Sequence, residues 1–297
     1  MEETKRFGIF DGFWLKIIAM VLMTIDHIGI FLNASSSTQS LGLLFRIIGR
    51  VSFPLFIFLL AEGMRHTSRP FRYVLRLFGV YAAITLVETI AVYGFSDVIG
   101  YTPNSLSPHP FTDLVLIGLT LACLRQKGAW KLFALLPAGV VILSYGCDVY
   151  DCFHPSNVNH WFPFYLRAGY GIFGLLIALG FYFAPAVLGV LLRKPLNENG
   201  ISVNAFIETS SGRKALNIVS ITLFFLVTVL LWGISYLTPK GELGGGIDMS
   251  LETYCLFAAP FLYFYNGKRG YDSKIYRFIA YWYFPVHLIV LFLIFSI

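Results

Sequence analysis

FWLKIIAMVLMTIDHIGIFL, residues 13–32, is an apolar stretch interrupted by one lysine and an adjacent Asp–His pair. A helix needs about 20 mostly apolar residues to cross a bilayer. Eight further stretches qualify, at 41–64, 72–93, 111–124, 131–147, 161–192, 216–237, 251–266 and 278–297. Most are unbroken apolar runs without the alternation of barrel strands. Pro185 in the long sixth stretch predicts a tilt, kink or split, so we expect nine or ten spans.

Composition supports the same architecture. Of the 297 residues, 57% are hydrophobic and 13% charged, about half the charge that a soluble domain carries. This deficit excludes soluble globular and disordered chains, which must solvate a large polar surface. The net charge of +6 is then a property of the loops and indicates no nucleic-acid partner. We expect an all-α, polytopic helical membrane protein with a single domain over 1–297.

Basic residues predict the orientation. With a cytoplasmic N-terminus, the inner segments hold 17 of the 22 lysines and arginines, as the positive-inside rule requires. These segments are 1–12, 65–76, 125–131, 193–215 and 267–277. The polar segment 193–215 is expected to be a mobile cytoplasmic loop. No signal peptide is recognisable, so the first span is expected to remain as an anchor.

Four cysteines contribute little to the functional prediction. Cys147 and Cys152 fall in a predicted outer loop, where an oxidising compartment would allow them to pair, and the sequence leaves that pairing open. Metal-ligand spacing of the C-x-x-C type is absent, so no metal site is predicted.

The densest group of membrane charges comes from the first two spans. Each charge costs at least ~2.5–3.5 kcal/mol near the bilayer centre unless it is paired or hydrated. His27 shares a helix face with Lys16 and lies about 20 Å from the inner end, in the outer half of the membrane. Asp26 points about 100° away from His27. A hairpin with a short 33–40 loop would bring Arg46 and Arg50 level with both.

This cluster has two interpretations. In one, Asp26 pairs with Arg46 or Arg50 and staples the hairpin, and His27 is a passive neighbour. In the other, His27 is a general base, which suits its pKa near working pH, and Asp26 and Arg50 position the reacting groups. Gly49 predicts close helix packing, and Pro54 predicts a kink.

Further ionisable residues can be interpreted either as structural or as functional. Arg65, Arg69 and Arg72 form either a positive-inside loop against lipid headgroups or a phosphate site for a nucleotide-bearing donor. His287, near mid-membrane in the last span, is either a packing residue or functional. The remaining membrane or outer-loop candidates are Glu62, Glu88, His109, Asp113, Asp148, Asp151, His154, His160 and Arg167.

The chain resembles the TraX family, whose founding members are F-pilin acetylases. The resemblance rests on LKIIAMVLMTIDHIG (15–29), RIIGRVSFPLFIFLLAEGMRHTSRPFRYVLRL (46–77), GYGIFGLL (169–176), FLYFYNGKRG (261–270) and FIAYWYFPVHL (278–288). More distantly it is similar to the transmembrane acyltransferase superfamily. Gly169 replaces the Asp that usually precedes the central Tyr-Gly, and 94–160 matches only loosely.

The resemblance implies a membrane acetyltransferase with acetyl-CoA as its donor substrate. His27, Asp26 and Arg50 are then the expected catalytic residues, with Arg50 or Asn266 as a donor to the oxyanion. The expected donor-binding residues are Lys16, Arg46, Arg65, Arg69, Arg72, Asn266, Arg269 and His287. The acceptor would be an outer-facing pilin N-terminus, glycan or lipid-linked sugar, and the location the bacterial inner membrane, in contact with membrane lipid.

Two other classes of function stay open from the sequence. A proton-coupled transporter or flippase would use Asp26, His27 and Arg50 along a substrate path. A non-catalytic assembly factor for a secretion or conjugation apparatus would tolerate loss of both His27 and Arg50.

Overall fold

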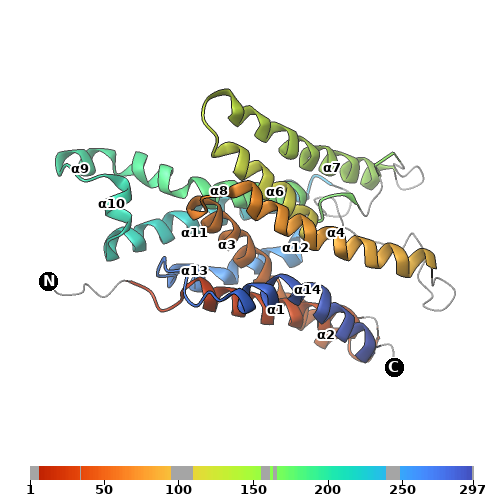
Figure 1. Ribbon diagram of the computed structural model, residues 1–297. Helices are drawn as coiled ribbons and strands as arrows, with labels where there is room; N and C mark the ends of the chain where they lie inside the picture. Colours follow the sequence, from red (N-terminus) through yellow and green to blue (C-terminus); the bar gives the residue numbers. More distant parts are fainter. Residues whose placement is uncertain are drawn as a thin grey trace. The chain divides into compact units, whose positions relative to one another are not determined.

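The computed structural model describes residues 7–33, 35–94, 110–154, 161–162, 166–238 and 248–295, and these residues are built from helices (Figure 1). The all-α prediction is therefore confirmed. Phe10 and Tyr265 form an isolated β-bridge. The elements are α1 (Gly12–Asn33), α2 (Gln39–Gly49), α3 (Ser52–His66), α4 (Pro70–Gly94), α6 (Pro110–Leu124), η2 (Gly128–Ala134), α7 (Leu135–Phe153), α8 (Gly171–Leu191), α9 (Arg193–Glu198), α10 (Val203–Ile207), α11 (Ser210–Ser235), α12 (Met249–Glu252), η4 (Thr253–Ala258), α13 (Ala259–Tyr263) and α14 (Lys274–Phe295).

Six helical stretches of the described chain are long and apolar enough to cross a membrane. They are Gly12–Asn33, Gln39–His66, Gly128–Phe153, Gly171–Leu191, Ser210–Ser235 and Lys274–Phe295. The protein is thus a multi-pass membrane protein. The count of nine or ten spans and the cytoplasmic N-terminus stay predictions.

Two predicted segments take a different form. The stretch 251–266 is not one spanning helix, because it is divided among α12, η4 and α13. The expected loop 193–215 is largely helical: it contains α9, α10 and the start of α11. Ser202 caps α10 by accepting a hydrogen bond from the Ala205 N–H at 3.2 Å, and Ile207 is buried against α8 and α11. The loop prediction rested on the overall polar composition of 193–215, which does not show an N-cap or a single buried side chain.

Proline has different effects in two spans. Pro185 lies inside α8, which continues through it, so of the predicted tilt, kink or split the split is absent. Pro54 lies in the first turn of α3, and α2 ends at Gly49, leaving a break at residues 50 and 51. Because proline has no N–H to donate to the carbonyl four residues earlier, a break at this point follows from the sequence.

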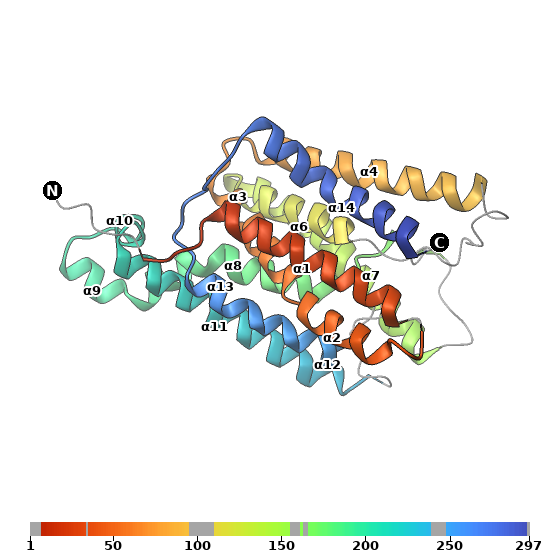
Figure 2. The same ribbon diagram turned by 90° about the horizontal axis from the view of Figure 1, so that it is seen from below.

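The chain divides into two compact units. The first comprises 1–62, 177–230 and 251–297, and the second comprises 63–176 and 231–250. In the first unit α1 packs against α2 and α14, which lie on either side of it in Figure 2. In the second unit α6 packs against α4, η2 and α7. The expected single domain stays a prediction.

Glycines allow α1 and α2 to approach closely. A Cβ on Gly49 would lie 2.2 Å from the Asp26 Cβ, and one on Gly42 would lie 2.6 Å from the Asn33 nitrogen. The predicted close packing at Gly49 is thus confirmed. Ser52 adds a link from α3 to α1 by donating its hydroxyl to the Ala19 carbonyl at 2.8 Å.

Candidate active site

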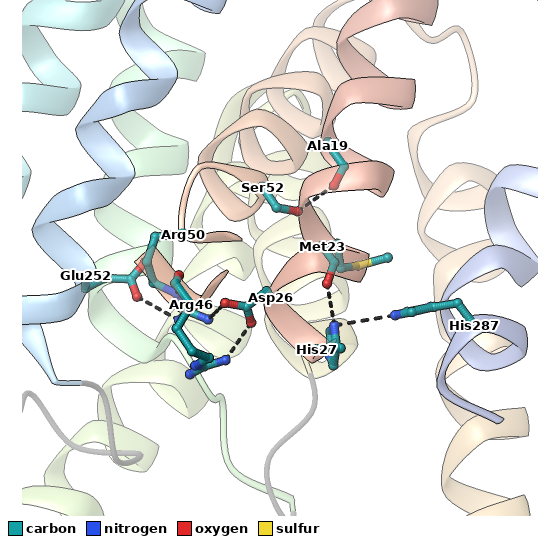
Figure 3. A network of polar contacts seen from close by, with 9 residues as sticks. All are labelled: Ala19, Met23, Asp26, His27, Arg46, Arg50, Ser52, Glu252 and His287. Carbon is teal, nitrogen blue, oxygen red and sulfur yellow. Dashed lines mark hydrogen bonds and ion pairs between the residues drawn. The ribbon is translucent and has the colours of Figure 1, made fainter. Parts of the chain in front are cut away.

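Four charged side chains, three of them buried and Arg46 partly exposed, join α1 and α12 to the end of α2 and the break after it (Figure 3). The Asp26 carboxylate accepts hydrogen bonds from Arg46, at 2.6 Å, and from Arg50. Arg50 also donates to Glu252 at 3.1 Å. Two acids thus balance two arginines, which is how charges are accommodated at membrane depth. Asp26 thus pairs with both arginines that the first of the two interpretations offered as its partner.

Glu252 was not among the candidates from the sequence. It lies 202 positions after Arg50, so no spacing rule links the two. The sequence feature that could have identified Glu252 is a single carboxylate at the edge of the apolar run 251–266. In the structure this side chain is only 1% exposed. One oxygen, Oε2, accepts from Arg50, and the other, Oε1, is buried without a hydrogen-bond partner among the described residues.

His27 faces away from this cluster, toward α14 (Figure 3). Its Nδ1 lies 2.7 Å from the Met23 carbonyl oxygen. Because a carbonyl oxygen only accepts, the ring carries its hydrogen on Nδ1, and Nε2 keeps a basic lone pair. The side chain is partly buried. Asp26 and His27 are neighbours in sequence, but their side chains point about 100° apart and contact different helices.

A second histidine approaches from α14. The Nε2 of His287 lies 3.4 Å from Nδ1 of His27, and its own Nδ1 lies 2.9 Å from the Tyr283 carbonyl oxygen. Tyr283 is further linked to α1 through its hydroxyl, 2.7 Å from that of Thr24. Phe284 lies edge-on to both imidazoles. The sequence identified His27 and His287 separately and did not pair them.

Part of this site lies in a stretch of sequence that is similar to a known family. Residues 12–149 match the family model described as TraX protein. The matched stretch covers a little less than half of the chain. A curated relative, a probable fimbrial assembly protein FimC, serogroup H1, from Dichelobacter nodosus, is 37% identical over 75 residues. That match covers 25% of this chain and 30% of the relative, and no solved structure matches.

The TraX match covers one half of the site. It includes Asp26 and His27 on α1, Arg46 on α2, and Arg50 in the break that follows α2. Glu252 and His287, supplied by α12 and α14, lie outside the matched residues.

Asn266 and Arg269, which the sequence analysis assigned to acetyl-CoA binding, lie beside the first residues of α1. The Gly12 N–H donates to the Lys268 carbonyl at 2.8 Å, and Asn266 accepts from the Lys268 N–H at 2.8 Å. His27 is fifteen residues further along α1, about 22 Å away at 1.5 Å per residue. The expectation that Asn266 stabilises an oxyanion at His27 is therefore wrong, because a helix rise separates them. A place for Asn266 and Arg269 in the donor site stays a prediction.

Lys16 lies between these two levels. It is eleven residues before His27, about 16 Å along the helix, and its ammonium lies 5.4 Å from the centre of the Tyr276 ring. Arg269 is 73% exposed and pairs with Asp272 at 2.7 Å. Both cations belong to the first unit and to the end of α1 that is predicted to be cytoplasmic.

Arg65, Arg69 and Arg72 belong to the second unit. Arg69 and Arg72 are exposed around the turn between α3 and α4, and Arg65 is half-buried. Arg125 supports this turn by donating to the carbonyls of Met64 and Thr67, both at 2.5 Å.

Two further membrane charges, Glu62 and Asp113, have structural partners. Glu62 accepts from Arg213 at 3.3 Å. Asp113, fully buried, accepts from the backbone N–H groups of Tyr170 and Gly171. These contacts account for two of the ionisable residues that the sequence singled out. The Glu88 side chain, His109 and His160 lie outside the described residues.

Arg167 is 1% exposed and donates to Asp148 at 2.7 Å and to Asp151 at 2.6 Å. Burial alone would lower the pKa of Arg167, but the hydrogen bonds and charges of the two carboxylates raise it above its usual range. The neighbouring Cys147 and Cys152 are thiols rather than a disulfide.

Proposed function

We propose that this protein is a bacterial inner-membrane acetyltransferase that moves an acetyl group from cytosolic acetyl-CoA to an amine or hydroxyl at the outer side of the membrane. The observation that carries the proposal is the Met23 carbonyl bond, which leaves Nε2 of His27 as a base inside the span α1. The TraX match over residues 12–149 supports an acetyl-transfer role, since the founding members of that family are pilin acetylases. The fimbrial relative supports a pilin N-terminus as the acceptor, ahead of a glycan or lipid-linked sugar.

His27 has two tasks in this reaction. Its Nε2 takes the proton from the acceptor nitrogen or oxygen as that atom forms a bond to the thioester carbon. When the carbon–sulfur bond breaks, His27 returns the same proton to the departing thiolate. The proton balance closes within the site, so the reaction needs no metal or other co-reactant.

The charge cluster acts as an anchor in this scheme. Three nitrogens of Arg50 donate to protein oxygens, those of Arg46, Asp26 and Glu252. These bonds fix α1 against α2 and α12, and so they fix the level of His27 in the membrane. Asp26 and Arg50 therefore contribute by positioning rather than by contact with the substrate.

The donor is proposed to enter from the cytosol. Guanidinium groups match phosphate oxygens in geometry and charge, so Arg65, Arg69 and Arg72 suit the CoA phosphates. Lys16 and Arg269 add positive charge at the start of α1, about 16 Å or more from His27. Within the first unit, an extended pantetheine arm that follows α1 would span the distance from Lys16 to His27.

Acetyl-CoA binding and acetyl transfer test the proposal together. Purified protein in nanodiscs is titrated with acetyl-CoA, and transfer of radiolabelled acetyl to a synthetic pilin N-terminal peptide is followed in parallel. His27→Ala should bind the donor as the wild type does and lose transfer, and an Arg65→Gln/Arg69→Gln double variant should bind it less tightly. His154→Ala is the matched control, because His154 also bonds to the carbonyl four residues earlier, at 3.0 Å.

Two results would contradict this function. Full transfer by His27→Ala would remove its proposed base. Absence of binding at millimolar acetyl-CoA would favour a proton-coupled transporter or flippase. The supporting observation is Oε1 of Glu252, which is buried without a hydrogen-bond partner in the described part of the chain.

A further inference from the structure

We propose that His287 is a positioning residue for His27: its Nε2 accepts a hydrogen bond from Nδ1–H of His27 and stabilises the ring when Nε2 of His27 becomes bonded to a proton or an acyl carbon. The catalytic role of His287 rests on the proposed function, whereas the contact between His287 and His27 is independent of it. The donor-binding role expected from the family resemblance is replaced, because both ring nitrogens of His287 have partners within the protein.

The direction of the hydrogen bond follows from two backbone carbonyls. Tyr283 O accepts at 2.9 Å from Nδ1 of His287, so that nitrogen carries the hydrogen and Nε2 of His287 has a lone pair. Met23 O holds the hydrogen of His27 on Nδ1 in the same way. The 3.4 Å contact therefore joins a donor on His27 to an acceptor on His287, and Nδ1–H of His27 is shared between two acceptors.

A positive ring at this depth needs such acceptors. When Nε2 of His27 takes a proton, the imidazole becomes a cation in a region with little water, where charges are expensive. The neighbouring carboxylate cannot serve it, because Asp26 faces the other side of α1 and is bonded to Arg46 and Arg50. A neutral imidazole supplies an acceptor without adding a second buried charge, as a carboxylate would.

The surroundings keep the two rings in place. Tyr283, one turn before His287, stacks on its ring with centroids 5.2 Å apart and is tied to Thr24 of α1. The Phe284 ring lies 5.7 Å from that of His27 and 5.5 Å from that of His287. The two imidazoles are nearly perpendicular, at 77°, with centroids 5.0 Å apart. Residues 283, 284 and 287 of α14 thus form one wall against His27.

Carbethoxylation by diethyl pyrocarbonate tests this role without any acetyl transfer. The reagent bonds its carbonyl carbon to the unprotonated ring nitrogen and expels ethyl carbonate, so the ring passes through a cationic state. A hydrogen bond to a charged group is strong enough to change such a rate about tenfold to a hundredfold. Mass spectrometry follows the modification of His27 over time, and His154 in the same sample is the internal reference because its Nδ1 has an equivalent bond to Tyr150 O.

Three proteins are compared, the wild type, His287→Phe and His287→Gln. Phenylalanine keeps a ring of similar size without an acceptor, and glutamine keeps an acceptor without an imidazole. Relative to His154, the rate at His27 should fall at least tenfold in His287→Phe and stay within about threefold of the wild type in His287→Gln. If His287→Phe does not elute as a monodisperse species, His287→Leu takes its place with the same expectation.

The outcomes separate the two proposals. Equal His27 rates in all three proteins, or an equal fall in the phenylalanine and glutamine variants, would overturn the role of His287 and leave the proposed acetyl transfer intact. The expected rates combined with no acetyl transfer by the wild type would uphold the contact and refute the proposed function.

Discussion

Gly49→Ala should destabilise the first unit strongly, because Gly49 is the point where α2 passes the Asp26 side chain. The added Cβ would lie 2.2 Å from the Asp26 Cβ and 2.6 Å from its Oδ1. Carbon atoms in contact sit about 3.5 Å apart, so α2 would have to retreat by roughly 1.3 Å. The same retreat would stretch the 2.6 Å bond between Arg46 and Asp26 to about 3.9 Å, beyond hydrogen-bond range.

The magnitude follows from the charges that would lose their partners. Breaking a buried ion pair, here Arg50 with Asp26, costs about 3–5 kcal/mol, and alanine returns up to about 1 kcal/mol in helix propensity. The net loss is about 2–4 kcal/mol. At roughly 2–4 °C per kcal/mol, the melting temperature should fall by about 4–16 °C.

The assay is the fraction of protein that remains monodisperse on size exclusion after heating in detergent. Gly79→Ala is the matched control, since Gly79 lies inside α4 with nothing within 4 Å of an added Cβ. It should melt at or slightly above the wild-type temperature. Gly49→Ala melting together with Gly79→Ala would refute the inferred contact between Gly49 and Asp26.

Two further substitutions test the second unit by the same melting assay. Arg167→Leu should lower the free energy of unfolding by about 3–5 kcal/mol, since it leaves the carboxylates of Asp148 and Asp151 without their shared cation. An unchanged melting temperature would count against this ion triad. Asp113→Leu should cost about 1–3 kcal/mol for each of the two buried N–H groups, of Tyr170 and Gly171, that lose their acceptor. Asp113→Asn, which keeps one acceptor oxygen, should lie between this variant and the wild type.

The sequence predicted the parts of the fold that depend on local pattern. Apolar length predicted the helical class, Gly49 predicted a close approach, and Pro54 predicted a kink where the structure has a break between α2 and α3. Helical geometry also predicted that Arg46 and Arg50 reach the level of Asp26. Each of these depends on residues within one hairpin, where the chain itself limits the possible arrangements.

Contacts between distant segments could not be predicted in the same way. Glu252 joins Arg50 across 202 positions, and His287 joins His27 across 260. Nothing in the spacing of residues specifies which helix packs beside α1 or how α14 is rotated about its axis. The loop prediction for 193–215 failed for a related reason, because Ile207 becomes buried only when α8 and α11 are in place.

The arrangement of the site follows from the angle between two consecutive residues of α1, Asp26 and His27. Consecutive residues on an α-helix point about 100° apart, so Asp26 and His27 cannot share a partner. Asp26 is committed to Arg46 and Arg50 on one side, and His27 is left for α14 on the other. Because one helix turn carries both residues, the ion pairs that anchor α1 also set the level and rotation of the His27 ring. A substitution that weakens these ion pairs should therefore displace His27, even though neither arginine touches it. Loss of activity in Asp26 or Arg50 variants would then reflect a displaced His27 ring rather than the loss of a group that contacts the substrate.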